Sequence, residues 1–156
     1  MFRPLLRKKQ ELPEERCIEI LKKQRRGVLS VIGDDGYPYG VPINHYYEEE
    51  DGCLYFHGGK QGHKIDALKK CDKVSYCVYG EGTKEDWYYL FESVIAFGRI
   101  TFVEDEEIII EKSRKLSLCF TDDEAYIDAE IARSLKGTLV LKMQIEHISG
   151  KRIKEN

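Results

Sequence analysis

The densest group of side chains that could do chemistry lies in a glycine-rich segment, residues 57–64, which reads HGGKQGHK. Its glycines let the backbone approach a ligand closely with its N–H groups exposed. The short helix expected over residues 63–70 would add unpaired N–H groups and the positive end of its dipole. Lys60, His63 and Lys64 place positive charge at the same position. The segment therefore predicts a site for a phosphate monoester, and the alternative is a solvated, mobile loop.

Other known patterns do not fit this segment. It is not a Walker A loop, because His63 separates Gly62 from Lys64, and it lacks the GxGxxG spacing of dinucleotide-binding loops. Cys53 and His57 share one face of a predicted strand but would lie about 13 Å apart, too far for one metal ion. With no CxxC or HxxxH pair, we expect no metal site.

Two strand segments also carry groups that could contact a ligand. Pro38 and Pro42 remove two ladder donors, so residues 37–48 are predicted to form an edge strand or a broken one. The backbone groups left unpaired there, with Asn44, could bind the edge of a flat heterocycle. Alternatively, the prolines only protect an edge strand from aggregation. Glu92 and Ser93 interrupt an aromatic strand, and either face solvent or contact a ligand.

Nucleophilic and carboxylate chemistry have little support. The sequence contains no GxSxG elbow. Its five cysteines are scattered and odd in number, without a CxxC pair. They are typical of small core residues in a reducing cytoplasm, which is the location we expect. The runs of acidic residues at 48–51 and 105–107 stand at turns or helix starts, where a solvated face is the simpler explanation.

Hairpins and a few inserted helices must position these groups. Strands are predicted over residues 28–32, 37–48, 53–57, 73–79, 87–103 and 138–149, and helices over 13–26, 63–70, 105–115 and 122–135. Residues 80–86 are predicted to be a polar loop, and Gly98 a bend in the long strand. The order favours an antiparallel barrel, closed by its hairpins, over βαβ winding. A small barrel has no room inside for a ligand, which would bind outside or at an interface.

Composition restricts the class of protein. The chain has 156 residues, 42% hydrophobic and 34% charged, which is one ordinary domain with a short N-terminal arm (1–11) and C-terminal tail (152–156). A net charge of −3 argues against a general nucleic-acid binder. No apolar run is long enough to span a membrane, and the first 15 residues have no apolar signal region.

An ordered series of short motifs resembles a known family. The series comprises residues 27–31, 35–42, 54–57, 62–64, 73–78, 92–98 and 148–151. Over roughly residues 12 to 154, the chain resembles the nitroimidazole-resistance (Nim) branch of the pyridoxamine 5′-phosphate oxidase-like flavoproteins. The resemblance implies a mainly β, six-stranded antiparallel FMN-binding split barrel, working as a homodimer with FMN at the subunit interface.

The resemblance also assigns roles to individual residues. It places the FMN phosphate at His57, Gly58, His63 and Lys64, the flavin ring at Val41, Pro42, Ile43 and Asn44, and further flavin contacts at Glu92, Ser93 and Val94. His57 would lie near the flavin and act in catalysis, where a histidine could donate a proton to a substrate that receives hydride. The flavin would supply the redox chemistry, and the protein position and charge.

The resemblance leaves two functions open. The first is an oxidoreductase that reduces small electron acceptors, nitro-aromatic compounds among them, with a transiently bound NADH or NADPH as donor. The second is a non-catalytic module that binds or senses flavin; a third reading is a dimer that has lost its cofactor. Pyridoxamine phosphate oxidation itself is not expected, because residues 148–156 lack the arginine- and histidine-bearing motif of the true oxidases.

Aromatic residues give an independent reason to expect a dimer. The chain has ten tyrosines, more than one small barrel can bury inside. Tyrosine and tryptophan suit interfaces because they combine an apolar body with a polar tip. The candidates are Tyr37, Tyr39, Tyr46, Tyr47, Trp87, Tyr88 and Tyr89.

Overall fold

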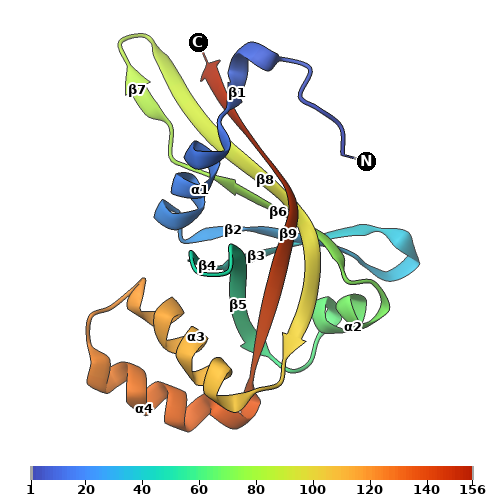
Figure 1. The fold of residues 1–156 in the computed structure, drawn as a ribbon, viewed down its shortest axis with the longest axis vertical. Helices are drawn as coiled ribbons and strands as arrows, with labels where there is room; N and C mark the ends of the chain where they lie inside the picture. The colour runs from blue at the N-terminus through green and yellow to red at the C-terminus, as the bar shows by residue number, and fades with distance from the viewer. Residues whose placement is uncertain (1, 156) are drawn as a thin grey trace.

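A strongly curled antiparallel sheet is the framework of the molecule (Figure 1). The computed structural model describes residues 2–155. Over this range nine strands form one sheet in the order β3-β2-β6-β8-β9-β5-β4, with β1 paired to β9 and β7 to β8. The strands are β1 (Glu11–Leu12), β2 (Arg26–Ile32), β3 (Pro38–Asn44), β4 (Tyr46–Glu48), β5 (Cys53–Gly59), β6 (Lys73–Tyr79), β7 (Thr83–Glu85), β8 (Tyr88–Val103) and β9 (Thr138–Glu155). The helices are α1 (Glu14–Lys23), α2 (His63–Lys70), α3 (Glu106–Leu118) and α4 (Glu124–Ser134).

The sheet confirms the split-barrel prediction. In the described part of the chain, six strands have seven or more residues, and β1, β4 and β7 are short additions of two or three. The hairpin pattern predicts full closure, but the hydrogen-bonded order ends at β3 and at β4, so the ladder stays open. The reason is that the chain passes from β3 directly into β4 across His45, and two successive parts of one strand region cannot pair with each other.

The two longest strands, β8 and β9, form the backbone of the barrel. Their pairing shifts register between Phe97 and Gly98, where a β-carbon on Gly98 would overlap the backbone oxygen of Gln144. The bend predicted at Gly98 is therefore confirmed. Residues 152–155, expected to be a tail, are the last part of β9 and pair with Tyr89–Glu92 of β8. In the predicted loop 80–86, β7 pairs with the start of β8.

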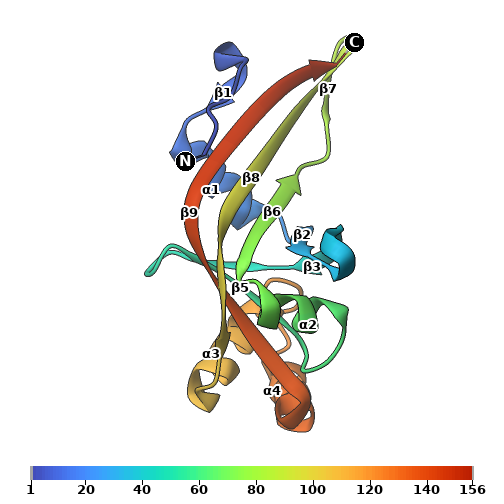
Figure 2. The same cartoon turned by 90° about the vertical axis from the view of Figure 1, so that its right-hand side faces the viewer.

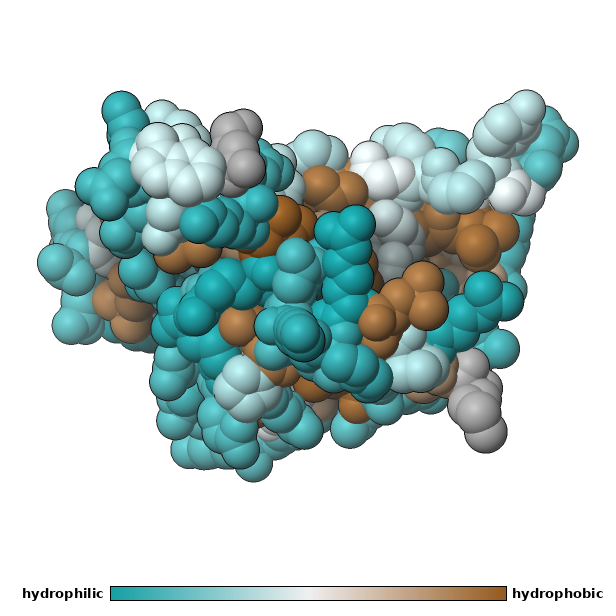
Figure 3. Space-filling model, turned by 90° about the horizontal axis from the view of Figure 1, so that it is seen from above, coloured by the Kyte–Doolittle hydropathy of each residue, from teal (hydrophilic) through white to brown (hydrophobic). Residues whose placement is uncertain are grey.

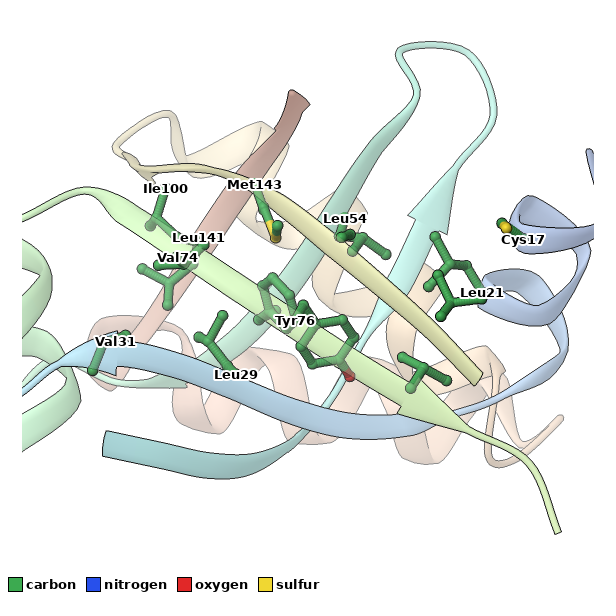
Figure 4. Close-up of a cluster of buried hydrophobic side chains, with 14 of the residues drawn as sticks. Cys17, Leu21, Leu29, Val31, Leu54, Val74, Tyr76, Ile100, Leu141 and Met143 are labelled. Atoms are coloured by element: carbon green, nitrogen blue, oxygen red, sulfur yellow. The ribbon is translucent and has the colours of Figure 1, made fainter. Parts of the chain in front are cut away.

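The interior of the curled sheet holds the main core. Alternate side chains of the strands point inward, including Leu29, Leu54, Tyr76 and Met143, all fully buried (Figure 4). Burial of such side chains contributes about 1.5–3 kcal/mol each. The amphipathic helix α1 adds buried residues beside this core and covers one side of the sheet.

Close packing of α1 on β9 explains a glycine in the last strand. A β-carbon on Gly150 would lie 2.5 Å from Cys17 Sγ and 3.2 Å from Leu12 Cβ. Only glycine lets the helix and β1 approach the strand this closely. The motif at residues 148–151 therefore has a packing role in this fold.

The other three helices lie toward the opposite end of the sheet from β7 (Figure 2). Helix α2 packs near β2, and α3 and α4 form a helical hairpin beside β5 and the beginning of β9. Asp105 and Asp123 cap α3 and α4 by accepting hydrogen bonds from backbone N–H groups of the first turn. The helices predicted at 105–115 and 122–135 therefore both exist, and they cover this end of the barrel.

Candidate functional site

His57 lies near the end of β5, where the strand turns from the core toward solvent. Its neighbour Phe56 is fully buried, and His57 itself is paired in register with Val140 of β9. Although part of the ring is exposed, neighbouring atoms partly desolvate it. This desolvation, with the positive charge of Lys64 second, lowers the pKa of His57 below its usual value. The imidazole is therefore mainly neutral at pH 7, with one nitrogen able to donate and one able to accept.

The loop after His57 brings Lys64 back over Gly58. A β-carbon on Gly58 would stand 3.4 Å from Lys64 Nζ, ordinary contact distance. Lys64 is half-buried, and this burial lowers the pKa of its ammonium group. Among residues 2–155, no hydrogen-bond or ion-pair partner satisfies Lys64 Nζ. A partly desolvated ammonium without an acceptor is a position where an anion would be stabilised.

The glycine before α2 shapes the other side of this loop. Gly62 has a φ of 120°, a conformation that side chains disfavour, and from it the chain enters α2 at His63. The first turn of α2 thus presents its N–H groups beside the loop. The structure therefore brings together His57, Gly58, Lys64 and the beginning of α2, as the sequence predicts.

His63 faces a different neighbour. Its ring stacks on Tyr39 with centroids 4.2 Å apart, and its Nε2 accepts a hydrogen bond from the backbone N–H of Asp34 at 3.3 Å. These contacts join α2 to the hairpin between β2 and β3. His63 consequently positions the loop against the beginning of β3, and its predicted contact with phosphate stays a prediction.

The predicted ring-binding segment is the second half of β3. It pairs only with β2, at the end of the sheet order, so the expected edge strand is confirmed. Pro42 is exposed, Val41 and Ile43 are half-buried, and Asn44 Oδ1 accepts a hydrogen bond from Arg26 Nε at 3.2 Å. Backbone groups on the outer edge of β3 therefore have no ladder partner within the described strands, and could bind a ligand.

The flavin contacts predicted on β8 lie away from His57 and the loop at residues 57–64. They are Glu92, Ser93 and Val94. Val94 is fully buried in the core, and Ser93 pairs with Tyr79 of β6. Glu92 accepts hydrogen bonds from Arg16 at 2.5 Å and from Arg152 at 2.6 Å. The hydrogen bond from Arg16 is the main reason that the pKa of Glu92 is lowered. The hydrogen bond from Arg152 lowers this pKa further. Within one chain, these residues do not converge on His57, and their flavin contacts stay a prediction.

A cavity beside His57 was not predicted from the sequence. A cavity of about 220 Å³ lies between His57, at the end of β5, and the hairpin of α3 and α4. Ser113 and Ser117 line it from α3, and Tyr126 and Ile127 from α4. The only sequence signal was the spacing of the two serines, four residues apart on one helix face. Within residues 2–155, no three His, Cys, Asp or Glu side chains group as metal ligands.

Comparison with known proteins identifies the family. The family model for pyridoxamine 5′-phosphate oxidase matches residues 13–152, so the chain belongs to this family. Among curated proteins, none matches the sequence. Across the described residues, no helix is both long and apolar enough to cross a membrane.

Several solved structures share the fold. A proposed 5-nitroimidazole antibiotic resistance protein from Bacteroides thetaiotaomicron is 24% identical, with a TM-score of 0.78 over 93% of this chain and 87% of its own. A conserved hypothetical protein from Mycobacterium tuberculosis is 16% identical, with a TM-score of 0.79 over 95% and 90%. An FAD-binding protein from Mesorhizobium loti is 23% identical, with a TM-score of 0.67 over 92% and 97%.

Proposed function

We propose that this protein binds FMN and uses it to reduce small electron acceptors, nitro-aromatic compounds among them, with NADH or NADPH as donor. The observation that carries the proposal is Lys64, half-buried beside Gly58 at the beginning of α2 and without an acceptor of its own among residues 2–155. Family membership and the FAD-binding relative from Mesorhizobium loti support a flavin as the ligand.

The residues present fit such a cofactor. Lys64 and the N–H groups of α2 would hold the phosphate, and the free edge of β3 at residues 41–44 would hydrogen-bond the ring. The flavin would supply the redox chemistry when bound. His57, mainly neutral at pH 7, would hold a proton beside the substrate and donate a hydrogen bond to it.

Replacing Lys64 with alanine tests the phosphate site. A charge-assisted hydrogen bond contributes about 1.5–3 kcal/mol, so we expect Lys64→Ala to weaken FMN binding roughly 10- to 100-fold. The dissociation constant is measured by quenching of flavin fluorescence. Lys69→Ala, at an exposed position in the last turn of the same helix, is the matched control and should change the dissociation constant less than twofold. Riboflavin, which lacks the phosphate, should bind both variants and the unaltered chain equally.

Equal FMN affinity in Lys64→Ala would remove Lys64 from the site. Protein that stays colourless after addition of FMN and desalting would overturn flavin binding altogether. Reduction of the bound flavin by NADH or NADPH, followed by its absorbance, separates a reductase from a module that only binds flavin. FAD titrated in parallel determines which of the two flavins the site prefers.

We also propose that the protein is a homodimer and that the outer face of β8 forms part of the interface. The aromatic residues named from the sequence lie on three separate hairpins rather than one patch (Figure 1). On β8, however, Ile95 is 41% exposed and Phe97 37% exposed on the same strand face. Figure 3, viewed from the end that carries β1 and β7, also shows apolar side chains between the hydrophilic ones. Apolar surface of this kind is typical of an interface.

Sedimentation equilibrium tests the dimer. The unaltered chain should sediment with twice the 18.2 kDa of one chain at micromolar concentration. Phe97→Asp places a charge in the proposed interface and should weaken association at least tenfold. Ala129→Asp, exposed on α4 and so outside the outer face of β8, serves as control and should leave association unchanged. A monomeric unaltered chain would contradict the proposal.

A further inference from the structure

An open groove lies between the end of α1, the beginning of β2 and the turn that follows β6. Its volume is about 770 Å³, within the range of ~300–1,000 Å³ that is typical of sites for small molecules. The loop between α3 and α4 forms another side of it through Phe120. The groove is therefore shaped by elements that are far apart in sequence, and these can be followed in Figure 1.

One wall of the groove is apolar and carries exposed aromatic rings. Val28 and Pro42 are register partners of β2 and β3, and both line the groove. Two further lining residues are Tyr79, which is 65% exposed, and Phe120, which is 46% exposed. Because these two rings come from separate elements and bury little of their surface in the chain, they could hold a flat ring by stacking.

Three exposed cations line the same groove, namely Lys23, Arg25 and Arg26. Within residues 2–155, none of them forms an ion pair with a carboxylate. Arg25 Nη1 donates a hydrogen bond to the carbonyl oxygen of Lys22 at 3.1 Å, and Arg26 Nε donates to Asn44 Oδ1 at 3.2 Å. Each guanidinium therefore keeps most of its N–H groups available for another acceptor.

The balance of charge in the groove favours an anion. Among residues 2–155, Glu81 is the only carboxylate that lines it, so three cations against one carboxylate leave an excess of two positive charges. The chain as a whole has a net charge of −3, opposite in sign to this local excess. Arginine binds phosphate through parallel N–H groups, and the aromatic rings add stacking. A nucleotide combines both features, a flat ring and phosphate.

We propose that this groove binds the adenosine part of the nicotinamide donor and that Arg25 and Arg26 hold its 2′-phosphate, so that the protein uses NADPH in preference to NADH. The adenine ring would lie against Tyr79 and Phe120. Pro42 belongs both to the groove and to the segment at residues 41–44 proposed to contact the flavin, so a dinucleotide in the groove would extend toward that ring. The choice of donor rests on the proposed function, whereas binding of an adenosine phosphate does not.

Adenosine 2′,5′-bisphosphate is the probe, because it carries the 2′-phosphate of NADPH without the nicotinamide. Its binding to the full chain is measured by chemical-shift perturbation in NMR and compared with adenosine 5′-monophosphate. We expect the bisphosphate to perturb residues 23–28 and 79–81 and to bind at least about tenfold more tightly than the monophosphate. Arg25→Gln and Arg26→Gln together should abolish this difference. Arg133→Gln, exposed on α4 and outside the groove, is the control and should keep it.

Two further measurements test the ring and the donor. Phe120→Ala removes an aromatic ring but no charge, so it should weaken binding of both adenosine phosphates by the same factor, about fivefold. Steady-state kcat/KM for flavin reduction should be at least about tenfold higher with NADPH than with NADH. The double arginine variant should lose this preference, and Arg133→Gln should retain it.

The outcomes separate the groove from the proposed function. Equal binding of the two adenosine phosphates, or perturbations outside the groove, would overturn the proposal, as would a second copy of the chain that covers the groove and prevents binding. Bisphosphate bound in the groove of a chain whose flavin neither donor reduces would contradict only the reductase. Flavin reduced equally well by both donors, with no bisphosphate bound, would contradict only the groove.

Discussion

Replacing Glu48 with glutamine should lower the free energy of unfolding by about 3 kcal/mol. Glu48, on β4, is 4% exposed, and one of its oxygens accepts hydrogen bonds from Lys112 Nζ at 2.7 Å and Lys115 Nζ at 2.5 Å. Burial alone would raise the pKa of Glu48, but these two lysines outweigh it and lower the pKa. Removing the carboxylate charge leaves the ammonium of Lys112, itself 8% exposed, short of its main partner.

The loss of unfolding free energy in Glu48→Gln should be at the lower end of the range that is typical when a buried ion pair loses one partner. Glu111 also accepts a hydrogen bond from Lys112 at 3.0 Å and forms an ion pair with Lys115 at 3.1 Å. It compensates part of the lost charge from an exposed position. Unfolding in urea at pH 7 measures the loss.

An exposed ion pair in the same helical hairpin provides the control. Glu124 pairs with Arg114 at 3.3 Å, and the Glu124 side chain is 70% exposed. Glu124→Gln should therefore cost less than about 1 kcal/mol. Replacing Glu48 by leucine and Lys112 by methionine together should cost less than Glu48→Gln, because no buried charge is then left unpaired. Equal losses in Glu48→Gln and Glu124→Gln would show that burial adds nothing to this ion pair.

The Glu48 ion pairs also explain why the candidate site was only partly predictable. The loop at residues 57–64 could be predicted because its glycines, lysines and following helix are neighbours in sequence. The cavity could not, since it depends on how α3 packs against β4 and β5. That packing is fixed by Glu48 and Lys112, which are 64 residues apart in sequence. Nothing in the local pattern of Ser113 and Ser117 indicates which neighbour they face.

The same distinction applies to the fold. Elements that local sequence signals mark were predicted, and elements that depend on pairing with a distant strand were not. The bounds of α2 and β6 were predicted correctly, because turn residues and apolar periodicity mark both ends. The short strands β1 and β7 were missed, since each exists only by pairing with a long strand. The last residues of β9 were expected to be a tail, yet pairing with β8 extends the strand to Glu155. Tertiary pairing overrides propensity in each case.

Acidification should destabilise the protein through His45, which no sequence pattern singled out. His45 lies between β3 and β4 and is 1% exposed. Its Nε2 lies 2.7 Å from the carbonyl oxygen of Leu21, and its Nδ1 lies 2.8 Å from the hydroxyl of Tyr76. A neutral ring donates to Leu21 through Nε2, and its Nδ1 shares the single proton of the Tyr76 hydroxyl with the carbonyl oxygen of Ile43, which lies 3.0 Å from that hydroxyl. Burial is the main reason that the pKa of His45 falls from 6.5 to about 4.

The direction of the effect follows from this lowered pKa. Below pH 6.5 the unfolded chain takes up a proton on His45, whereas the folded chain does so only near pH 4. The stabilisation is therefore complete above pH 6.5 and is lost as the pH falls toward 4. A difference of this size corresponds to a loss of about 2 kcal/mol between pH 7.5 and pH 5. Urea unfolding at the two pH values measures it.

The comparison that isolates His45 uses two variants. His45→Gln cannot take up the proton, so its unfolding free energy should change by about 2 kcal/mol less between the two pH values than that of the unaltered chain. His57→Gln should keep most of the change, because the His57 ring is partly exposed. Only the change with pH is compared, so a lower stability of His45→Gln at pH 7.5 does not affect the result. An equal change in His45→Gln and in the unaltered chain would mean that the buried ring between β3 and β4 does not titrate on unfolding.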